Sequence, residues 1–226
     1  MIIFIPIKEN SQRVPRKNFR DFGGEPLYKH TLLKYVEDEV YVDTDSDEIM
    51  SEIKKDSRLS NVVAYERNKN LIGDKVSVCS LVADFINRFK IRNAIAQIHV
   101  TSPFLERRLI TNAHSLIGDY DSVVSCNVYN SRFWRKEEYG YCPVNHNPVK
   151  MEQTQDLPKM YEENSAFYIF KPGVLGYTNS RVGKNPYFYE VLFPHSLDID
   201  NEKDWTMALK MKGNKDRIDS DLIGET

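Results

Sequence analysis

The sequence contains little cysteine and no long hydrophobic run. Its 3 cysteines, Cys79, Cys126 and Cys142, form no Cys-x-x-Cys pair, which excludes a disulfide framework and indicates free thiols in a reducing compartment. The longest apolar opening, residues 1–7, includes Pro6 and leads directly into charged residues. It is too short to span a membrane and lacks the basic start of a signal peptide. We therefore expect a soluble cytoplasmic protein.

The sequence also lacks an excess of charge of either sign. Lys and Arg number 31, Asp and Glu number 33, and the net charge is −2, whereas a general nucleic-acid-binding protein carries a basic excess. The 5 histidines and 3 cysteines are scattered without metal-ligand spacing, which argues against a structural zinc site. Hydrophobic residues make up 41% and charged residues 28%, so we expect an ordinary globular chain with one large domain.

Apolar, strand-like runs alternate with helix-like segments along much of the chain. The run over residues 1–7 is continuous and rich in isoleucine, as in a strand buried on both faces of a parallel sheet. Further strands are predicted at residues 40–43, 62–65, 94–100, 122–125, 165–170 and 187–192. Helices are predicted at residues 27–36, 47–56, 76–89, 107–117 and 202–211. The alternation predicts an α/β fold with a doubly wound, mostly parallel sheet.

Two segments do not fit this alternation. Residues 128–160 are rich in Tyr, Asn, Pro and Lys and contain a cluster of aromatic side chains. We interpret them as a small inserted arm, which is either an interface with a second subunit, where aromatic residues are enriched, or a local satellite core. Residues 212–226 form a polar tail that we expect to be loosely held. The main domain is then residues 1–211.

A basic loop follows the first predicted strand. Residues 8–18 hold Lys8, Arg13, Arg16 and Lys17 against the single acid Glu9. At the carboxyl end of a buried strand, such a loop directs cations and backbone N–H groups to one point, as a polyphosphate requires. The spacing matches neither a P-loop nor the dinucleotide fingerprint. A solvated basic loop is the alternative.

An acidic pair precedes the last predicted helix. Asp198 and Asp200 stand two residues apart, so in an extended segment both side chains project to the same face. Two carboxylates that converge in this way are suited to Mg²⁺, which prefers carboxylate and phosphate oxygens. The alternative is an acidic cluster at the start of a helix, where negative charge is favourable.

The basic loop resembles the N-terminal signature of the acylneuraminate cytidylyltransferases, the CMP-sialic acid synthetases. Ser11, Pro15, Lys17 and Asn18 match that signature directly. Lys8 stands where the family has Arg, and this exchange keeps the charge but loses the bidentate fork. Gln12 stands where the family has Lys, and Arg13 is the replacement cation. The resemblance implies that this loop wraps the triphosphate of CTP.

Four further segments resemble the same family in chain order. Residues 42–46 resemble the end of its second strand, and we interpret Ser46 as a helix N-cap. Arg67 matches an Arg that reaches the cytosine, and Ser77 is either a helix cap or a nucleotide contact. His99 replaces a Gln that reaches the sugar, although a lone His is more often structural. The fourth segment, residues 155–169, carries Gln155 and Asn164.

The resemblance implies an enzyme that joins CTP to a 2-keto sugar acid and releases pyrophosphate. It also implies a Rossmann-like sheet of the nucleotide-diphospho-sugar transferase type, Mg²⁺ as cofactor and a homodimer formed through the arm. Its partners are CTP and a small acidic sugar, with no nucleic acid and no membrane. The resemblance implies that Lys17 and Asp200 are catalytic and that Asp198 and Asp200 bind the metal. The implied nucleotide-binding residues are Lys8, Ser11, Arg13, Lys17, Asn18, Arg67 and Ser77. The implied substrate-binding residues are His99, Gln155 and Asn164.

The departures from the family pattern leave the acceptor and two other function classes open. The family often carries basic residues just before the position of Gln155, where this chain has Glu152, Gln153 and Thr154. A cation that would hold the carboxylate of the acceptor is therefore missing from its usual place. One alternative is a nucleotide-sugar-dependent glycosyltransferase, which also uses an Asp-x-Asp pair. The other is a nucleotide-binding homologue that has lost catalysis.

Overall fold

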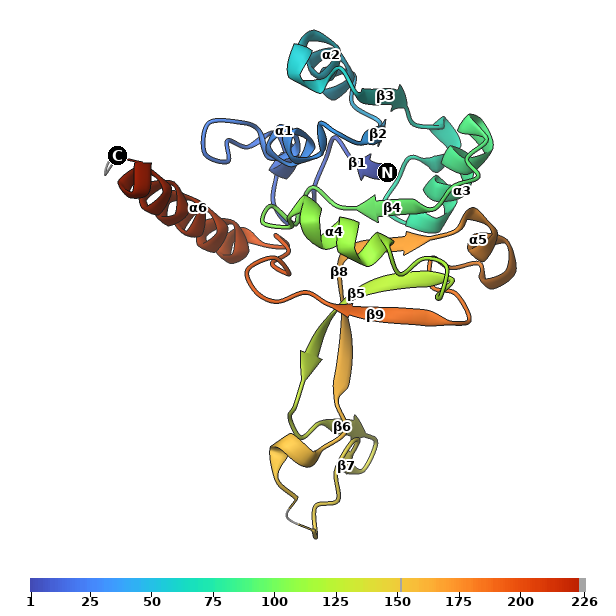
Figure 1. Cartoon of the computed structure of the whole chain (residues 1–226), viewed down its shortest axis with the longest axis vertical. Helices are drawn as coiled ribbons and strands as arrows, with labels where there is room; N and C mark the ends of the chain where they lie inside the picture. Colours follow the sequence, from blue (N-terminus) through green and yellow to red (C-terminus); the bar gives the residue numbers. More distant parts are fainter. Residues whose placement is uncertain (151, 224–226) are drawn as a thin grey trace.

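A seven-stranded sheet forms the centre of the molecule (Figure 1). The computed structural model describes residues 1–150 and 152–223, with side chains described as far as residue 213. In the order of the sheet the strands are β3 (Val62–Glu66), β2 (Glu39–Thr44), β1 (Ile2–Ile7), β4 (Ile95–Ile98), β8 (Met160–Phe170), β5 (Ser122–Tyr129) and β9 (Pro186–Glu190). Only β8 runs antiparallel to its neighbours, β4 and β5, so the expected mostly parallel sheet is confirmed.

Helices cover both faces of the sheet, as expected of a doubly wound fold. On one face, α3 (Val78–Phe89) and α5 (Pro172–Thr178) bury an apolar cluster that includes Phe4, Phe85 and Tyr168. On the other face lie α1 (Leu27–Leu32), α2 (Asp47–Lys55) and α4 (Arg107–His114), over the buried side chains of Ile3 and Ile5. The sequence predicted four of these helices to within a few residues but did not predict α5.

The inserted segment projects from the body as an arm (Figure 1). Strands β5 and β8 continue past the sheet and stay paired as far as Tyr129 and Met160. Beyond them β6 (Trp134–Glu137) and β7 (Gly140–Pro143) form a separate two-stranded sheet. The side chains of Tyr139 and Val149 are 94% and 92% exposed, whereas Leu157 is 4% exposed and the rings of Trp134 and His146 lie 4.9 Å apart. The arm therefore packs part of its apolar surface locally and displays the rest.

Strand β8 bends where the arm joins the sheet. The pairing of β5 with β8 shifts register between Val124 and Cys126. Opposite this shift, Ser165 has a φ of 59°, in the left-handed region that favours glycine. This geometry explains why the family pattern places a glycine where this chain has Ser165.

The last helix, α6 (Glu202–Ile223), is longer than predicted. The expected end near Met211 was wrong, because the helix continues past it and a single Gly213 does not end a helix. The loosely held tail stays a prediction. The start of α6 is fixed by a reciprocal cap. Asn201 Oδ1 accepts from the Asp204 N–H at 3.1 Å, and Asp204 Oδ2 accepts from the Asn201 N–H at 3.1 Å. This cap holds the backbone immediately after Asp200.

Candidate nucleotide site

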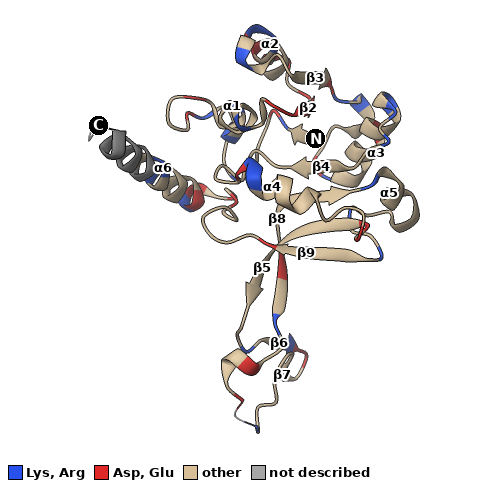
Figure 2. Ribbon diagram, viewed as in Figure 1, with Lys and Arg blue, Asp and Glu red and all other residues tan. Residues whose placement is uncertain are grey.

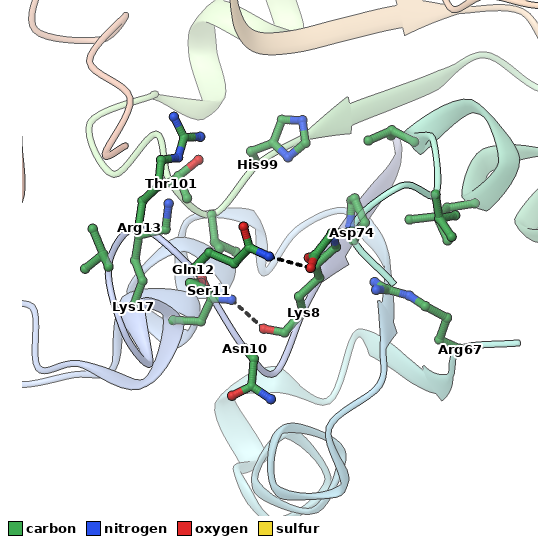
Figure 3. A pocket seen from close by; sticks show the side chains of 17 residues that line it. Lys8, Asn10, Ser11, Gln12, Arg13, Lys17, Arg67, Asp74, His99 and Thr101 are labelled. Atoms are coloured by element: carbon green, nitrogen blue, oxygen red, sulfur yellow. Dashed lines mark hydrogen bonds and ion pairs between the residues drawn. The ribbon is translucent and has the colours of Figure 1, made fainter. Parts of the chain in front are cut away.

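A cavity of about 400 Å³ opens at the carboxyl end of β1 (Figure 3). The basic loop forms one wall, and the residues that follow β4 form another. Seven residues predicted to bind nucleotide or substrate line it together: Lys8, Ser11, Arg13, Lys17, Asn18, Arg67 and His99. This is the edge of a parallel sheet at which ligands bind in open α/β folds.

The basic loop is held closed by its own backbone and by two buried side chains. Asn18 is buried and its Nδ2 donates to the Lys8 carbonyl at 2.7 Å, which joins the two ends of the loop. Val14 is fully buried, and its carbonyl accepts from the Lys17 N–H at 3.1 Å. The loop thus presents its cations from a fixed backbone.

Each cation that lines the cavity contacts an oxygen of the protein. Lys8 Nζ lies 3.5 Å from Asp74 Oδ1, and Arg13 Nη2 lies 2.6 Å from Asp200 Oδ1. Lys17 Nζ donates to the carbonyl of Ile199 at 2.5 Å. The oxygens of a bound phosphate chain would take the same positions next to these cations.

Gln12 and Asp74 form a contact across the cavity that the sequence analysis did not predict. Gln12 Nε2 donates to Asp74 Oδ2 at 2.6 Å, as Figure 3 shows. The same carboxylate meets Lys8. Asp74 therefore connects the basic loop to the segment before α3.

The acidic pair lies beside Lys17. Residues 197–200 belong to no helix or strand, and Ile199 between the two carboxylates is fully buried. Its N–H donates to the Thr101 carbonyl at 2.9 Å, which ties the pair to the loop after β4. Both carboxylates act on Lys17: they raise its pKa, although burial has the larger effect and lowers it. That Asp198 and Asp200 converge on one cation stays a prediction.

Asp198 has an unsatisfied oxygen. Burial raises the pKa of its carboxyl, and Asp200 acts in the same direction, while Thr101 and Lys17 oppose the shift. Its Oδ1 is buried without a hydrogen-bond partner. The described residues contain no group of three or more His, Cys, Asp or Glu side chains placed to hold a metal. The pair nevertheless fits Mg²⁺, which is commonly bound by one or two carboxylates together with substrate phosphates.

Arg67 is almost completely enclosed at the far end of the cavity. Its side chain is 1% exposed and forms an ion pair with Asp43 at the end of β2. Its Nη2 donates to the carbonyls of Ile7 and Asp43 at 3.3 and 3.1 Å. Nη1 is buried without a partner, so one donor edge is left for a ligand in the cavity. The ion pair with Asp43 was not predicted from the sequence.

Five predicted site residues do not line this cavity: Asp198 and Asp200, described above, and Ser77, Gln155 and Asn164. Ser77 is the N-cap of α3, where its side chain accepts from the Ser80 N–H at 3.1 Å; Ser46 caps α2 in the same way, as predicted. Gln155 is exposed on the arm. Asn164 lies where the arm joins the sheet, and its Nδ2 donates to Asn127 Oδ1 at 3.2 Å.

The base of the arm is acidic. Figure 2 shows acidic residues on β8 at this junction. Glu162 accepts hydrogen bonds from Asn127 and Tyr129 at 3.0 and 2.6 Å, and Glu163 accepts from Tyr168 at 2.8 Å. The cation that the sequence lacks before Gln155 is therefore not supplied by these neighbours.

The family of the chain follows from comparison with known proteins. Residues 2–210 match the family described as cytidylyltransferase. The chain belongs to the cytidylyltransferase family. Among the residues that the structure describes, no helix combines the length and apolar character needed to cross a membrane.

Its relatives act on several sugar acids, according to their names. The chain is 30% identical to N-acylneuraminate cytidylyltransferase A of Danio rerio over 208 residues, which cover 88% of this chain and 47% of the relative. It is 27% identical to CMP-N,N'-diacetyllegionaminic acid synthase of Legionella pneumophila over 231 residues, covering 93% of this chain and 95% of that protein. Thus the cytidylyltransferase chain spans about half the length of some curated relatives and nearly all of another.

Solved structures share the fold at low sequence identity. CMP:2-keto-3-deoxy-manno-octonic acid synthetase, complexed with CTP, superimposes with a TM-score of 0.67 at 12% identity, covering 95% of this chain and 98% of the other. 4-Diphosphocytidyl-2C-methyl-D-erythritol synthase superimposes with a TM-score of 0.63 at 12% identity, covering 92% and 96%. The cytidylyltransferase chain therefore has the α/β fold expected from its sequence.

Proposed function

We propose that this chain is an enzyme that joins CTP to a 2-keto sugar acid of the sialic acid kind, giving a CMP-sugar and pyrophosphate. One observation carries the proposal: Lys8, Arg13 and Lys17 line a single cavity beside the Asp198–Asp200 pair. Membership of the cytidylyltransferase family supports the choice of CTP. The names of relatives that act on N-acylneuraminic, legionaminic and pseudaminic acids support the choice of acceptor class.

In this proposal, different residues of the cavity contact different parts of the nucleotide. Lys8 and Lys17 neutralise the charge that builds on the phosphate oxygens when the sugar hydroxyl attacks the α-phosphorus. Arg67 offers its free Nη1 to the base, and such a donor meets acceptor atoms that cytosine and uracil present differently. Asp200 orients the attacking hydroxyl and accepts its proton.

Mg²⁺ is part of the proposal. Asp198 and Asp200 would hold the ion, and the buried Oδ1 of Asp198 is a ready ligand. When bound, Mg²⁺ stabilises the negative charge of the triphosphate during transfer.

We further propose a cytoplasmic homodimer formed through the arm. The aromatic side chains at the tip of the arm, including Tyr139 and Tyr141, are 94% and 66% exposed. Aromatic residues are enriched in the buried centres of protein interfaces.

Turnover with a panel of acceptors tests this function. The purified chain is mixed with CTP, Mg²⁺ and a series of 2-keto sugar acids, and pyrophosphate release and the mass of the product are followed. We expect pyrophosphate and a CMP-sugar in equal amounts, with UTP used about ten- to a hundred-fold less well, since a hydrogen bond to a charged group contributes about 1.5–3 kcal/mol. CTP binding without turnover of any acceptor would indicate a non-catalytic homologue, and sugar transfer from a CMP-sugar would indicate a glycosyltransferase.

A further inference from the structure

A buried hydrogen-bond chain connects His99, at the edge of the cavity, to Arg181 in the loop after α5. Gln97 on β4 lies between them and is fully buried. Arg181 Nη1 donates to Gln97 Oε1. On its other side, Gln97 Nε2 lies 3.0 Å from His99 Nε2 and 3.2 Å from the carbonyl of Ile98.

The orientation of the Gln97 amide follows from Arg181. A guanidinium has only donors, so the atom of Gln97 that faces Arg181 is the carbonyl oxygen. The amide nitrogen then faces Ile98 and His99, and its two hydrogens are used by the Ile98 carbonyl and His99 Nε2. The reverse orientation would set donor against donor at Arg181 and oxygen against oxygen at Ile98.

Arg181 is itself fixed. Its guanidinium carbon lies 3.8 Å from the centroid of the Tyr168 ring, a cation–π contact. The Tyr168 hydroxyl donates to Glu163 at 2.8 Å. The chain of contacts that begins at His99 thus ends on an acidic residue at the base of the arm.

We propose that Arg181 and Gln97 hold His99 as a neutral imidazole with its proton on Nδ1, so that His99 gives the ligand in the cavity a hydrogen-bond donor without a positive charge. Because Gln97 donates to Nε2, that nitrogen must accept and cannot carry a proton. His99 lines the cavity, and no hydrogen bond engages Nδ1 among the residues described. Arg181 and Gln97 are positioning residues, and His99 is the contact.

The electrostatic surroundings agree with a neutral ring. Burial lowers the pKa of His99 to about 4, and the positive charges of Arg181 and Lys17 act in the same direction. A cationic ring would also place its Nε2 proton against the Gln97 amide protons. The geometry and the charges therefore favour the same state.

This inference rests on the proposed function for the identity of the ligand, and it narrows the acceptor. Where His99 meets the sugar acid, the sugar must present an oxygen that accepts a hydrogen bond, such as a hydroxyl or an amide carbonyl. A neutral donor does not replace the carboxylate-binding cation that the chain lacks before Gln155.

The tautomer can be read directly in the full-length protein without nucleotide. Long-range proton–nitrogen NMR spectra of protein labelled at the histidine nitrogens distinguish the two neutral tautomers and the cation. The signal that is lost in His99→Gln is assigned to His99. We expect protonated Nδ1 and bare Nε2, unchanged between pH 7 and about pH 5. A bare Nδ1 or a cationic ring at pH 7 would overturn the inference.

Two variants test the positioning residues. In Gln97→Glu the carboxylate accepts from His99, so the proton should move to Nε2 or the ring become cationic at neutral pH. In Arg181→Met the Gln97 amide is free to turn, so both tautomers should be populated. Asn93→Asp adds the same charge in the exposed bend before β4 and should leave the His99 signal unchanged. If neither Gln97→Glu nor Arg181→Met changes that signal, the inference is wrong.

Kinetics separate this inference from the proposed function. Where the spectra of Gln97→Glu show the proton on Nε2, the Nδ1 donor is lost, and we expect the KM for the sugar acid to rise about tenfold, with the KM for CTP unchanged. A cationic ring keeps the Nδ1 donor and should not raise this KM. An unchanged KM for the sugar acid in a variant with the proton on Nε2 would contradict the donor role. If the spectra show the Nδ1 proton but no acceptor is turned over, the proposed function fails while the state of His99 stands.

Discussion

At the scale of single residues, Lys17 lies where the basic loop meets the acidic pair. It is partly buried, burial lowers its pKa, and its Nζ contacts the carbonyl of Ile199. The sequence indicated the charge of Lys17 and its place in a loop at a strand end. Its neighbours could not be predicted, because Ile199 lies 182 positions away in the chain.

Replacing Lys17 by Met should nearly abolish CMP transfer. Met keeps most of the apolar stem and removes the charge that opposes the build-up of negative charge on the phosphates. We expect kcat to fall at least a hundred-fold, since loss of one preorganised electrostatic contact costs about 2.7–4 kcal/mol of transition-state stabilisation. Pyrophosphate release at saturating CTP measures this effect, with the thermal unfolding midpoint as a control of folding. A variant with normal turnover would remove Lys17 from the site.

Asp74 contacts Lys8 and Gln12, so under the proposed function it competes with phosphate for them. In Asp74→Asn the competing charge is lost, so we expect the KM for CTP to fall about two- to fivefold, in keeping with up to about 1 kcal/mol for an exposed ion pair. The matched control is Glu9→Gln, which removes an exposed charge from the same loop but leaves the Lys8–Asp74 ion pair in place. A KM that rises in Asp74→Asn would show instead that Asp74 helps to hold the nucleotide.

Asp198 and Asp200 should both be required for turnover that depends on Mg²⁺. Asp200→Asn should be the more damaging change, because Asp200 is proposed both to bind the metal and to accept the proton, and the change also removes the charge that pairs with Arg13. Excess Mg²⁺ should restore Asp198→Asn more readily, since only a ligand is lost. Initial rates over a Mg²⁺ titration measure both effects. Full activity of both variants at limiting Mg²⁺ would show that the pair is only an acidic cluster at the start of a helix.

At the scale of elements, sequence patterns were most informative where burial decides the structure. Strand β1 and helix α3 carry apolar runs of the right period, so both could be predicted. Helix α5, with two glycines and a proline in seven residues, has no such pattern. The end of α6 was also missed, because the sequence after Met211 is mostly polar and has no apolar period that marks the length of a helix.

At the scale of elements, substitutions in the arm test the proposed dimer. Tyr139→Ser combined with Tyr141→Ser should convert a dimer to a monomer without lowering the thermal unfolding midpoint, because both side chains are exposed within the chain. Val36→Ser changes an exposed apolar residue on the body, 46% accessible, and should leave the dimer intact. Sedimentation velocity distinguishes the two states. A wild-type chain that is monomeric at all concentrations would contradict the proposed dimer.

Over the whole molecule, the candidate site is assembled from segments that are remote in sequence. Arg13 and Asp200 are 187 residues apart, and Gln97 and Arg181 are 84 apart. The loop after β1 and the Asp-x-Asp pair could each be identified as local patterns. The Arg67–Asp43 ion pair and the Gln97–Arg181 contact depend on how strands and loops meet in the fold, and neither leaves a local pattern in the sequence.

The fate of the sugar oxygen tests the central claim most directly. The acceptor that gives the fastest turnover is labelled with heavy oxygen at its anomeric hydroxyl and incubated with CTP and Mg²⁺, and the products are separated for mass spectrometry. If this hydroxyl attacks the α-phosphorus in the cavity at the end of β1, the label is retained in the CMP-sugar, between sugar and phosphate, and the pyrophosphate is unlabelled. Loss of label to water beyond what the free acceptor loses in the same buffer without enzyme, or pyrophosphate released without any CMP-sugar, would contradict the account.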